Sequence, residues 1–152
     1  MESCGRIQCA LIATATSNVI YERFYDRFSE VEKAEIRSAF QSAQRELSQD
    51  RQEAVGRLRT GAHVARAEGE LVYHALGTGE YDELTLAEML RFIATAFHDV
   101  LRKTPSEAVL LDNYTRVCII LSEIINEGIL EITDRATLLR ALKIKALNEA
   151  LS

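Results

Sequence analysis

The hydrophobic residues of this chain change their spacing in blocks, and the order of the blocks limits the folds it can adopt. Residues 7 to 26 have the spacing of strands, and residues 29 to 49 have the spacing of a helix. Strand spacing returns from residue 54 to 79, and helical spacing follows over the rest of the chain. Because strands and helices do not alternate one by one, this order favours a mainly antiparallel sheet with helices packed against it. We therefore expect an α+β fold, formed by a single domain over residues 1 to 152.

The first two strands are expected to form a hairpin. Ile7 to Thr14 is a continuous apolar run, as in a buried strand, and Asn18 to Asp26 has two alternating faces after a Thr-Ser-Asn turn. A second hairpin is expected in GAHVARAEGELVYHALGTG, whose two strands would fold about Glu68-Gly69-Glu70. Leu58 can belong to a further short strand before them, which would bring the sheet to five strands.

Four helices are expected, and each begins at a polar cap. In a capping box, a Ser or Thr side chain binds the backbone three residues later, and the Glu at that position binds back. Proline is favoured at the first helical position, and glycine is favoured just after the last one, which is the role expected for Gly128. The expected starts are the capping boxes Ser29–Glu32 and Thr85–Glu88, then Thr104 followed by Pro105, and finally Thr133 or Asp134, before a C-terminal helix over about 134 to 150.

The charge and composition of the chain argue against several classes of function. The formal net charge is −5 at pH 7, and no basic stripe is present, so we expect no nucleic-acid partner. No stretch approaches the ~20 apolar residues of a membrane span, so any membrane association would be peripheral. The three cysteines lack C-x-x-C spacing and a matching histidine pair, so they predict neither a disulfide framework nor a zinc site. A cytoplasmic protein is the default expectation.

The loop Gly77-Thr78-Gly79 has the position of a phosphate-binding loop but lacks its composition. It follows a strand and precedes a helix, but it has no third glycine, and the acidic stretch Glu80 to Glu83 would repel a phosphate. We expect a plain turn and no bound cofactor. Two carboxylate pairs lie in similar polar turns, where solvated charges are expected rather than an acid and a base. These pairs are Glu68 with Glu70 and Asp82 with Glu83.

The histidines and cysteines offer weak candidates for a metal or a nucleophile. His63 and His74 could face one another across a hairpin and form a weak metal site, although ordinary half-buried histidines explain them better. Cys9 lies inside a predicted strand and Cys118 on an apolar helix stripe, where a thiol is usually inert packing. We therefore assign no catalytic residue and no metal ligand.

Three apolar residues are not explained by the expected core of the domain. Ile129, Leu130 and Ile132 follow Gly128 and lie beyond the residues that the helix stripe needs. Apolar residues in excess of the core can mark a surface that binds another protein. The alternative is an ordinary connection between helices that is tucked under the sheet. The three residues are our candidates for a partner interface.

Two stretches resemble a known family. YERFYD (Tyr21 to Asp26) and IILSEIINEGILEIT (Ile119 to Thr133) are similar to the most recognisable stretches of the adaptor small-chain family, which contains the sigma subunits of clathrin adaptors and the zeta subunit of coatomer. The likeness extends over roughly residues 6 to 143. It implies a longin (SNARE-like) fold and no catalytic activity. It also implies a partner, since small chains of this family clasp the helical-solenoid trunk of a large adaptor or coat subunit.

Finer features of the resemblance concern the trafficking step. GEYDELTLAEML and LRKTPSEAVLLDNYTRVC are closer to coatomer zeta than to a sigma chain, and closest to the sigma-like small subunit of the plant TPLATE (TSET) complex. This implies clathrin-mediated endocytosis, with recruitment to the plasma membrane, or to a coated vesicle, and contact with clathrin only through the complex. Sigma chains also help to bind acidic dileucine signals near the junction of the second and third long helices. Here that junction, Leu101 to Leu111, is longer and contains Pro105, so no cargo residues are assigned.

Two other functions remain open. A longin or roadblock-like regulatory module that binds a small GTPase would have the same fold class and equally few catalytic groups. A small hydrolase or transferase would require an ordered metal or ligand beside His63 and His74.

Overall fold

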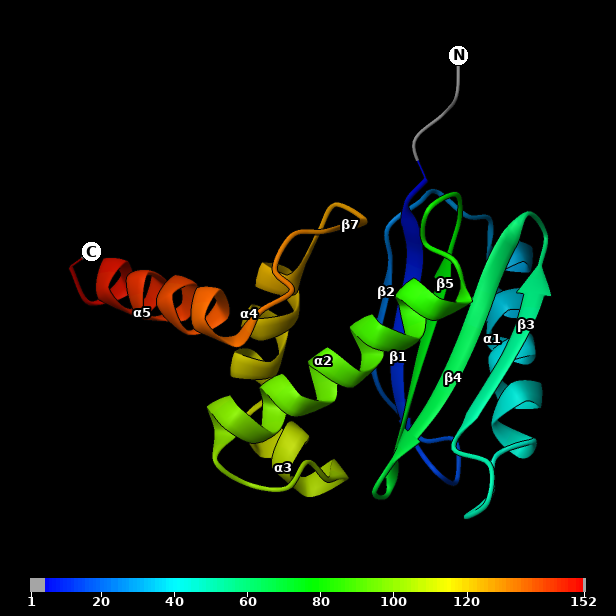
Figure 1. Cartoon of the computed structure of the whole chain (residues 1–152), viewed down its shortest axis with the longest axis horizontal. Helices are drawn as coiled ribbons and strands as arrows, with labels where there is room; N and C mark the ends of the chain where they lie inside the picture. The colour runs from blue at the N-terminus through cyan, green and yellow to red at the C-terminus, as the bar shows by residue number, and fades with distance from the viewer. Residues whose placement is uncertain (1–4, 152) are drawn as a thin grey trace.

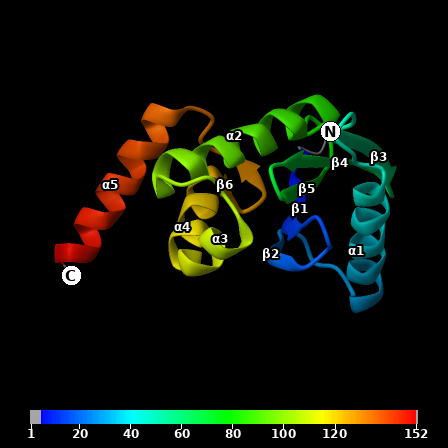
Figure 2. The same cartoon turned by 90° about the horizontal axis from the view of Figure 1, so that it is seen from below.

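A five-stranded sheet with a helix on each face forms one half of the molecule, and the remaining helices extend from one side of it (Figures 1 and 2). The computed structural model describes residues 5–151. The sheet strands are β1 (Ile7–Thr14), β2 (Val19–Phe24), β3 (Glu53–Leu58), β4 (Gly61–Glu68) and β5 (Leu71–Gly77). The long helices of the two faces are α1 (Glu30–Arg45) and α2 (Glu83–Leu101). Beyond them lie α3 (Glu107–Asp112), α4 (Tyr114–Ile124), the short strands β6 (Ile125–Asn126) and β7 (Ile129–Leu130), and α5 (Arg135–Leu151).

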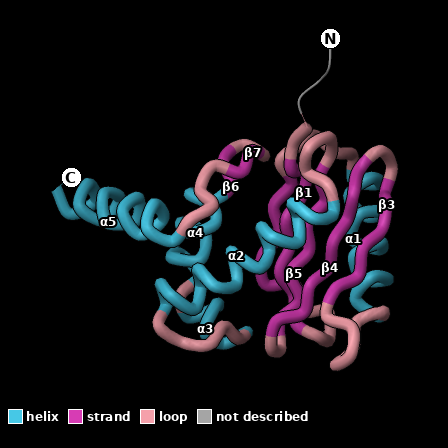
Figure 3. Tube along the Cα trace, in the orientation of Figure 1, coloured by secondary structure: helices cyan, strands magenta, loops and turns pink. Residues whose placement is uncertain are grey.

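The sheet has the order β2-β1-β5-β4-β3, and every neighbouring pair is antiparallel. Figure 3 shows β1, β5, β4 and β3 within this sheet. The expected α+β fold with a five-stranded antiparallel sheet is therefore confirmed. Both predicted hairpins form, and the strand expected around Leu58 is β3, at one edge of the sheet. In the described part of the chain, residues 5–151, no helix is both long enough and apolar enough to cross a membrane.

Side chains of the central strands alternate between the two helices. Val64 and Tyr73 belong to the core on the α2 side, and Ala65 and Leu76 belong to the cores on the α1 side. Because β5 is covered on both faces, all seven of its residues are buried. This explains why its sequence is nearly continuously apolar rather than alternating.

The expected cap of α1 is confirmed, and that of α2 is wrong. Ser29 and Glu32 form the complete capping box: the Glu32 N–H donates to Ser29 Oγ at 3.1 Å, and the Ser29 N–H donates to Glu32 Oε1 at 2.9 Å. In α2 the cap is Asp82, whose Oδ1 accepts from the Thr85 N–H at 2.9 Å. Thr85 is therefore inside the helix, since the Asp82 side chain already accepts from the Thr85 N–H and so caps the helix.

The third predicted helix starts later than expected and is broken in two. Ser106, not Thr104, is the cap, with its Oγ accepting from the Val109 N–H at 3.1 Å, so Pro105 precedes the helix. The helix breaks at Asn113, whose φ of −118° and ψ of 30° are not helical. The Asn113 side-chain amide donates to the Val109 carbonyl at 2.8 Å and so stabilises the break.

The predicted role of Gly128 as a helix C-cap is also wrong. Helix α4 ends at Ile124, and the chain continues through β6 and β7 before α5. The last helix starts where it was expected, since the Thr137 N–H donates to Asp134 Oδ2 at 2.9 Å.

Candidate functional site

The two short strands β6 and β7 form a tight hairpin, and it contains the predicted interface residues Ile129 and Leu130. Ile125 pairs with Leu130 and Asn126 with Ile129, so only two residues form the turn. Glu127 has a φ of 52° and Gly128 a φ of 80°, the pair of left-handed residues that a two-residue turn requires. A Cβ atom at Gly128 would lie 2.7 Å from the Ile7 carbonyl oxygen, so this position needs glycine for two reasons.

Arg6 fixes this hairpin to the sheet. Its guanidinium donates to the Glu127 carbonyl at 2.8 Å and to the Tyr25 carbonyl at 2.8 Å, and it forms an ion pair with Asp26 at 3.0 Å. The Ile7 N–H also donates to the Gly128 carbonyl at 2.7 Å. The hairpin is therefore held against the start of β1 and the end of β2, and we call this set of contacts the Arg6 clamp. Sequence reasoning missed it because the residues are far apart in the chain.

The three predicted interface residues have different environments. Ile129 is 41% exposed, Leu130 is half-buried against the main core, and Ile132 is 9% exposed and part of that core. The Leu130 N–H donates to the hydroxyl of Tyr81 at 3.0 Å, which fixes β7 to the loop before α2. Of the three, Ile129 is therefore the residue whose side chain is free to meet a partner, while Ile132 contributes to folding. Their role in binding stays a prediction.

The surface beside Leu130 is hollowed along α2. A small pocket of about 130 Å³ lies between Leu130, Thr133 and Phe92. A second pocket of about 200 Å³ continues from Phe92 to Leu139, where Arg135 and Asp99 form an ion pair at 2.9 Å. Phe92 is half-buried and packs against the main core, so it lines both pockets from the side of α2. We call the exposed side of the hairpin at Ile129 the hairpin face.

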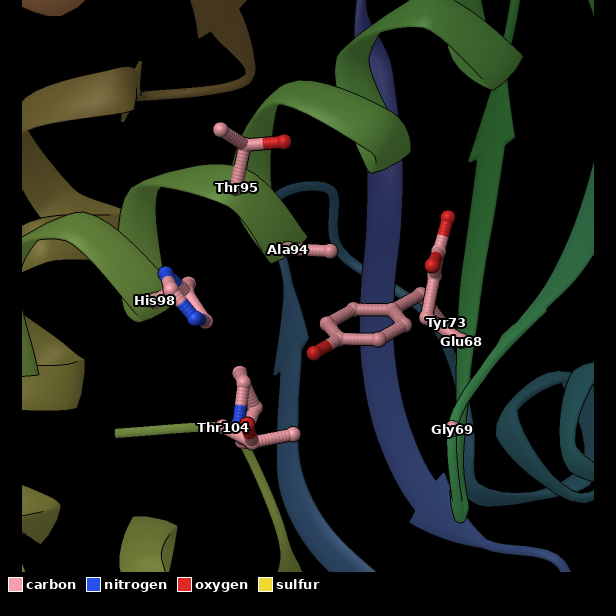
Figure 4. A pocket seen from close by; sticks show the side chains of 8 residues that line it. Glu68, Gly69, Tyr73, Ala94, Thr95, His98 and Thr104 are labelled. Atoms are coloured by element: carbon pink, nitrogen blue, oxygen red, sulfur yellow. The ribbon is translucent and has the colours of Figure 1, made fainter. Parts of the chain in front are cut away.

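A separate pocket lies at the junction between α2 and α3. This is the region that corresponds, by the resemblance described above, to the dileucine-binding region of sigma chains. The pocket has a volume of about 280 Å³, and Figure 4 shows Tyr73 pointing its hydroxyl toward Thr104 and His98. Tyr73 is 1% exposed, and its hydroxyl has no hydrogen-bond partner among the described residues. Burial raises the pKa of this phenol, so the hydroxyl stays protonated. Hydroxyl and imidazole groups therefore line part of this pocket. Its full lining is Glu68, Gly69, Tyr73, Ala94, Thr95, His98, Thr104 and Pro105.

His63 and His74 do face the same side of their hairpin, but they stack rather than converge. Both rings pack on Phe40 of α1, with ring centroids 4.6 and 4.9 Å from it, and they lie 5.8 Å from each other with nearly parallel planes. Ring nitrogens of parallel stacked imidazoles point along their own planes and do not aim at one shared ion. Within residues 5–151, no group of three or more His, Cys, Asp or Glu side chains could hold a metal.

The protonation of this histidine pair follows from its burial. The Gln44 amide donates to the Thr14 carbonyl at 2.7 Å, so its oxygen faces His74 Nε2, 3.0 Å away, and that nitrogen carries the proton. Burial lowers the pKa of His63 to about 4. Burial, together with the neighbouring His63, lowers the pKa of His74 to about 3. Both rings are therefore neutral packing groups at pH 7.

The remaining candidates have structural roles. Cys9 is fully buried, and burial raises the pKa of its thiol, which disfavours the reactive thiolate. Glu68 forms an ion pair with Arg66 at 2.7 Å, and Glu70 accepts the Glu107 N–H at 3.0 Å. Asp82 caps α2, and this hydrogen bonding lowers the pKa of its carboxyl.

The loop Gly77-Thr78-Gly79 is a turn paired with the start of the chain. The Thr78 N–H donates to the Arg6 carbonyl at 2.9 Å, and the Arg6 N–H donates to Thr78 Oγ1 at 3.1 Å. The Gly5 N–H binds Glu80 Oε2 at 2.9 Å. The backbone N–H groups of Gly5 and Arg6 thus bind this loop.

Comparison with known proteins gives two similarities. A sequence profile of the family described as Clathrin adaptor complex small chain matches residues 6–149. No curated protein is similar enough in sequence to count as a match. Among solved structures, the chain is similar to a chain in a homology model of the full-length AP-3 complex in a stretched open conformation, with a TM-score of 0.70 and 13% sequence identity. That similarity covers 95% of this chain and 94% of that chain, and at this identity it shows the fold.

Proposed function

We propose that this chain, which belongs to the clathrin adaptor complex small chain family, is a non-catalytic subunit that clasps and stabilises a large helical-solenoid subunit of an adaptor or coat complex. Members of this family are small subunits of adaptor complexes in vesicle transport. The observation that carries the clasping role is the hairpin face: Ile129 is 41% exposed on a turn that the Arg6 clamp holds in place. Because the backbone is already fixed there, binding a partner through this face costs little conformational entropy.

The trafficking step that we propose is clathrin-mediated endocytosis at the plasma membrane. The support is the likeness of residues 79 to 90 and 101 to 118 to the small subunit of the plant TPLATE complex, known as LOLITA. Clathrin and the membrane would then be reached through the complex rather than by this chain directly. The protein would be cytoplasmic and recruited to the membrane peripherally.

Co-purification with a large subunit tests this proposal. The tagged full chain is co-expressed with the trunks of candidate large subunits, including those of the TPLATE and AP-3 complexes, and the captured protein is quantified. We expect one trunk to co-purify in a 1:1 ratio. Ile129→Asp should reduce its recovery at least fivefold, because a carboxylate would be buried without a partner. The matched control is Val31→Asp on α1, which is 69% exposed and far from the hairpin in sequence.

The result also separates the rival functions. Leu130→Asp is expected to lower the unfolding temperature as well as binding, because Leu130 packs on the core. If no trunk is captured by a soluble, monomeric chain, the proposal is wrong. Capture of a small GTPase only when it is loaded with GTP would instead support a GTPase-binding regulatory module.

A further inference from the structure

Helix α5 presents apolar side chains on two opposite sides. It is the outermost element of the molecule, on the side away from the sheet (Figures 1 and 2). Leu138 is 1% exposed and packs in the main core, with Leu142 partly buried beside it. Leu147 follows Leu138 by nine residues, which is about two and a half helical turns and therefore the opposite side. Ile144 and Leu147 are 60% and 59% exposed.

This pattern differs from that of an ordinary surface helix. A helix that packs on one neighbour has one apolar stripe and a polar opposite face. In α5 the stripe of Leu138 and Leu142 meets the rest of the molecule, and the pair Ile144 and Leu147 has no such role. An apolar pair on an outward face is the feature expected of a helix that a second protein covers. We call the surface of Arg140, Lys143, Ile144 and Leu147 the outer face of α5.

Charge indicates what kind of protein covers this face. Helix α5 contains four Lys and Arg residues and one Glu, which gives it a formal charge of +3. Since the whole chain has a formal charge of −5, the residues outside α5 carry −8. Two of these cations are paired inward: Arg135 with Asp99 at 2.9 Å and Lys145 with Glu123 at 3.6 Å. Arg140 and Lys143 belong to the outer face and form no ion pair within the described residues. The exposed apolar pair is thus bordered by cations.

We propose that the outer face of α5 binds a helix of a partner protein whose apolar stripe is bordered by aspartate or glutamate. The inference rests on the proposed function, because a helical-solenoid subunit offers such helices at its surface. Acidic side chains of the partner would pair with Arg140 and Lys143 while its apolar stripe covers Ile144 and Leu147.

Two other occupants fit the charges less well. A symmetric pair of α5 helices from two copies would bring together two outer faces that each carry Arg140 and Lys143, which is repulsive. An anionic membrane would attract α5 but repel the rest of the chain, which carries −8. An interfacial helix also needs a wide apolar face, and here the exposed face has only two large apolar residues.

A peptide titration with the full chain tests the proposal without the natural partner. The probe is a fluorescent 18-residue helical peptide with leucines at i, i+3, i+4 and i+7 spacing and glutamates on both borders. A second peptide has lysines in place of the glutamates. We expect saturable binding of the acidic peptide by anisotropy and at least tenfold weaker binding of the basic one. Ile144→Asp with Leu147→Asp should weaken binding at least tenfold, and Lys143→Glu at least threefold.

Matched controls keep the outcome clear. Val31→Asp, on the exposed side of α1, should bind as the wild type does, and thermal unfolding should show that all variants fold. Equal binding of both peptides, or no loss in the Ile144 and Leu147 variant, would overturn the proposal. So would vesicle binding (30% phosphatidylserine) or dimerisation that this variant abolishes while it leaves peptide binding unchanged.

The co-purification experiment distinguishes this failure from failure of the proposed function. If a trunk is captured equally well by wild type and by the variant with aspartates at 144 and 147, this inference is wrong and the proposed function stands. If no trunk is captured by the wild type, the proposed function fails, and the peptide titration still decides whether the outer face of α5 recognises acidic helices.

Discussion

The buried pair His63 and His74 should make the protein unusually sensitive to mild acid. In an unfolded chain each imidazole has its ordinary pKa of 6.5, whereas burial lowers the native pKa of His63 to about 4 and that of His74 to about 3. At pH values between the native pKa and the unfolded pKa of a ring, the unfolded state binds a proton that the folded state does not. The stability conferred by the neutral rings is therefore complete well above pH 6.5 and is lost as the pH falls toward the native values.

The size of the effect can be worked out from these pKa values. At pH 5 each unfolded imidazole lies about 1.5 pH units below its pKa, which corresponds to about 2 kcal/mol per ring at ~1.4 kcal/mol per unit. Neither native ring is appreciably protonated at this pH. The pair together should therefore reduce the free energy of unfolding by about 4 kcal/mol between pH 7 and pH 5, a large share of the ~5–15 kcal/mol of a typical domain.

Urea denaturation at pH 7 and pH 5, followed by circular dichroism, measures this loss. The variant with His63→Gln and His74→Gln cannot take up these protons, so its free energy of unfolding should fall much less between the two pH values. Comparing the change with pH, rather than absolute stabilities, removes the packing cost of the substitutions. His98→Gln is the control, because that histidine is exposed and should leave the loss unchanged. If the double variant loses as much stability as the wild type, the two histidines are not buried as neutral rings.

Two pairs of matched substitutions test the remaining structure. Gly128→Ala should cost about 2–4 kcal/mol by urea denaturation, since a left-handed residue costs ~1–2 kcal/mol and the new Cβ would lie 2.7 Å from a backbone carbonyl of β1. Gly69→Ala, with a φ of 61° and open space at its Cβ, should cost only about 1 kcal/mol; equal losses would show that the contact with β1 is absent. Tyr73→Phe should be neutral or slightly stabilising in a thermal melt, because its hydroxyl has no partner among the described residues. Tyr81→Phe should cost about 1 kcal/mol, because it removes the acceptor of the Leu130 N–H, and the opposite ranking of the two tyrosines would contradict the hydrogen-bond assignment.

The sequence allowed the sheet and its helices to be predicted because their signals are periodic and extend over many residues. The alternation over Asn18 to Asp26 and the helical stripe from Leu86 to Leu101 each repeat several times. The predicted cap positions were wrong more often, because each depends on a single residue. Thr104 and Ser106 are both good cap residues, and the structure uses Ser106. Gly128 fits a helix C-cap and a two-residue hairpin equally well, because both need a left-handed residue.

The candidate site was predictable as a stretch of sequence but not as a surface. Ile129, Leu130 and Ile132 were recognised together as an apolar surplus, yet one is exposed, one is half-buried and one belongs to the core. Which side chain faces outward depends on the Arg6 clamp and on Tyr81, whose partners lie far away in the sequence. The periodicity of α5 places Leu147 opposite Leu138, and the structure shows that the side of Leu138 is covered by the core.

The Arg6 clamp has a consequence for how the chain matures during synthesis. It joins residues 6 and 127, which are 121 positions apart. The guanidinium can meet Tyr25 and Asp26 early in synthesis, but its contact with the hairpin forms only when most of the chain has left the ribosome. The strands of the central sheet are complete by residue 77, but one face of the sheet is covered only after α2 and the later helices follow. The hairpin that carries Ile129 is therefore among the last parts to acquire its native position. A chain that ends before the hairpin would lack the exposed side chain of Ile129, so we expect this part of the proposed interface to form only when translation is nearly complete.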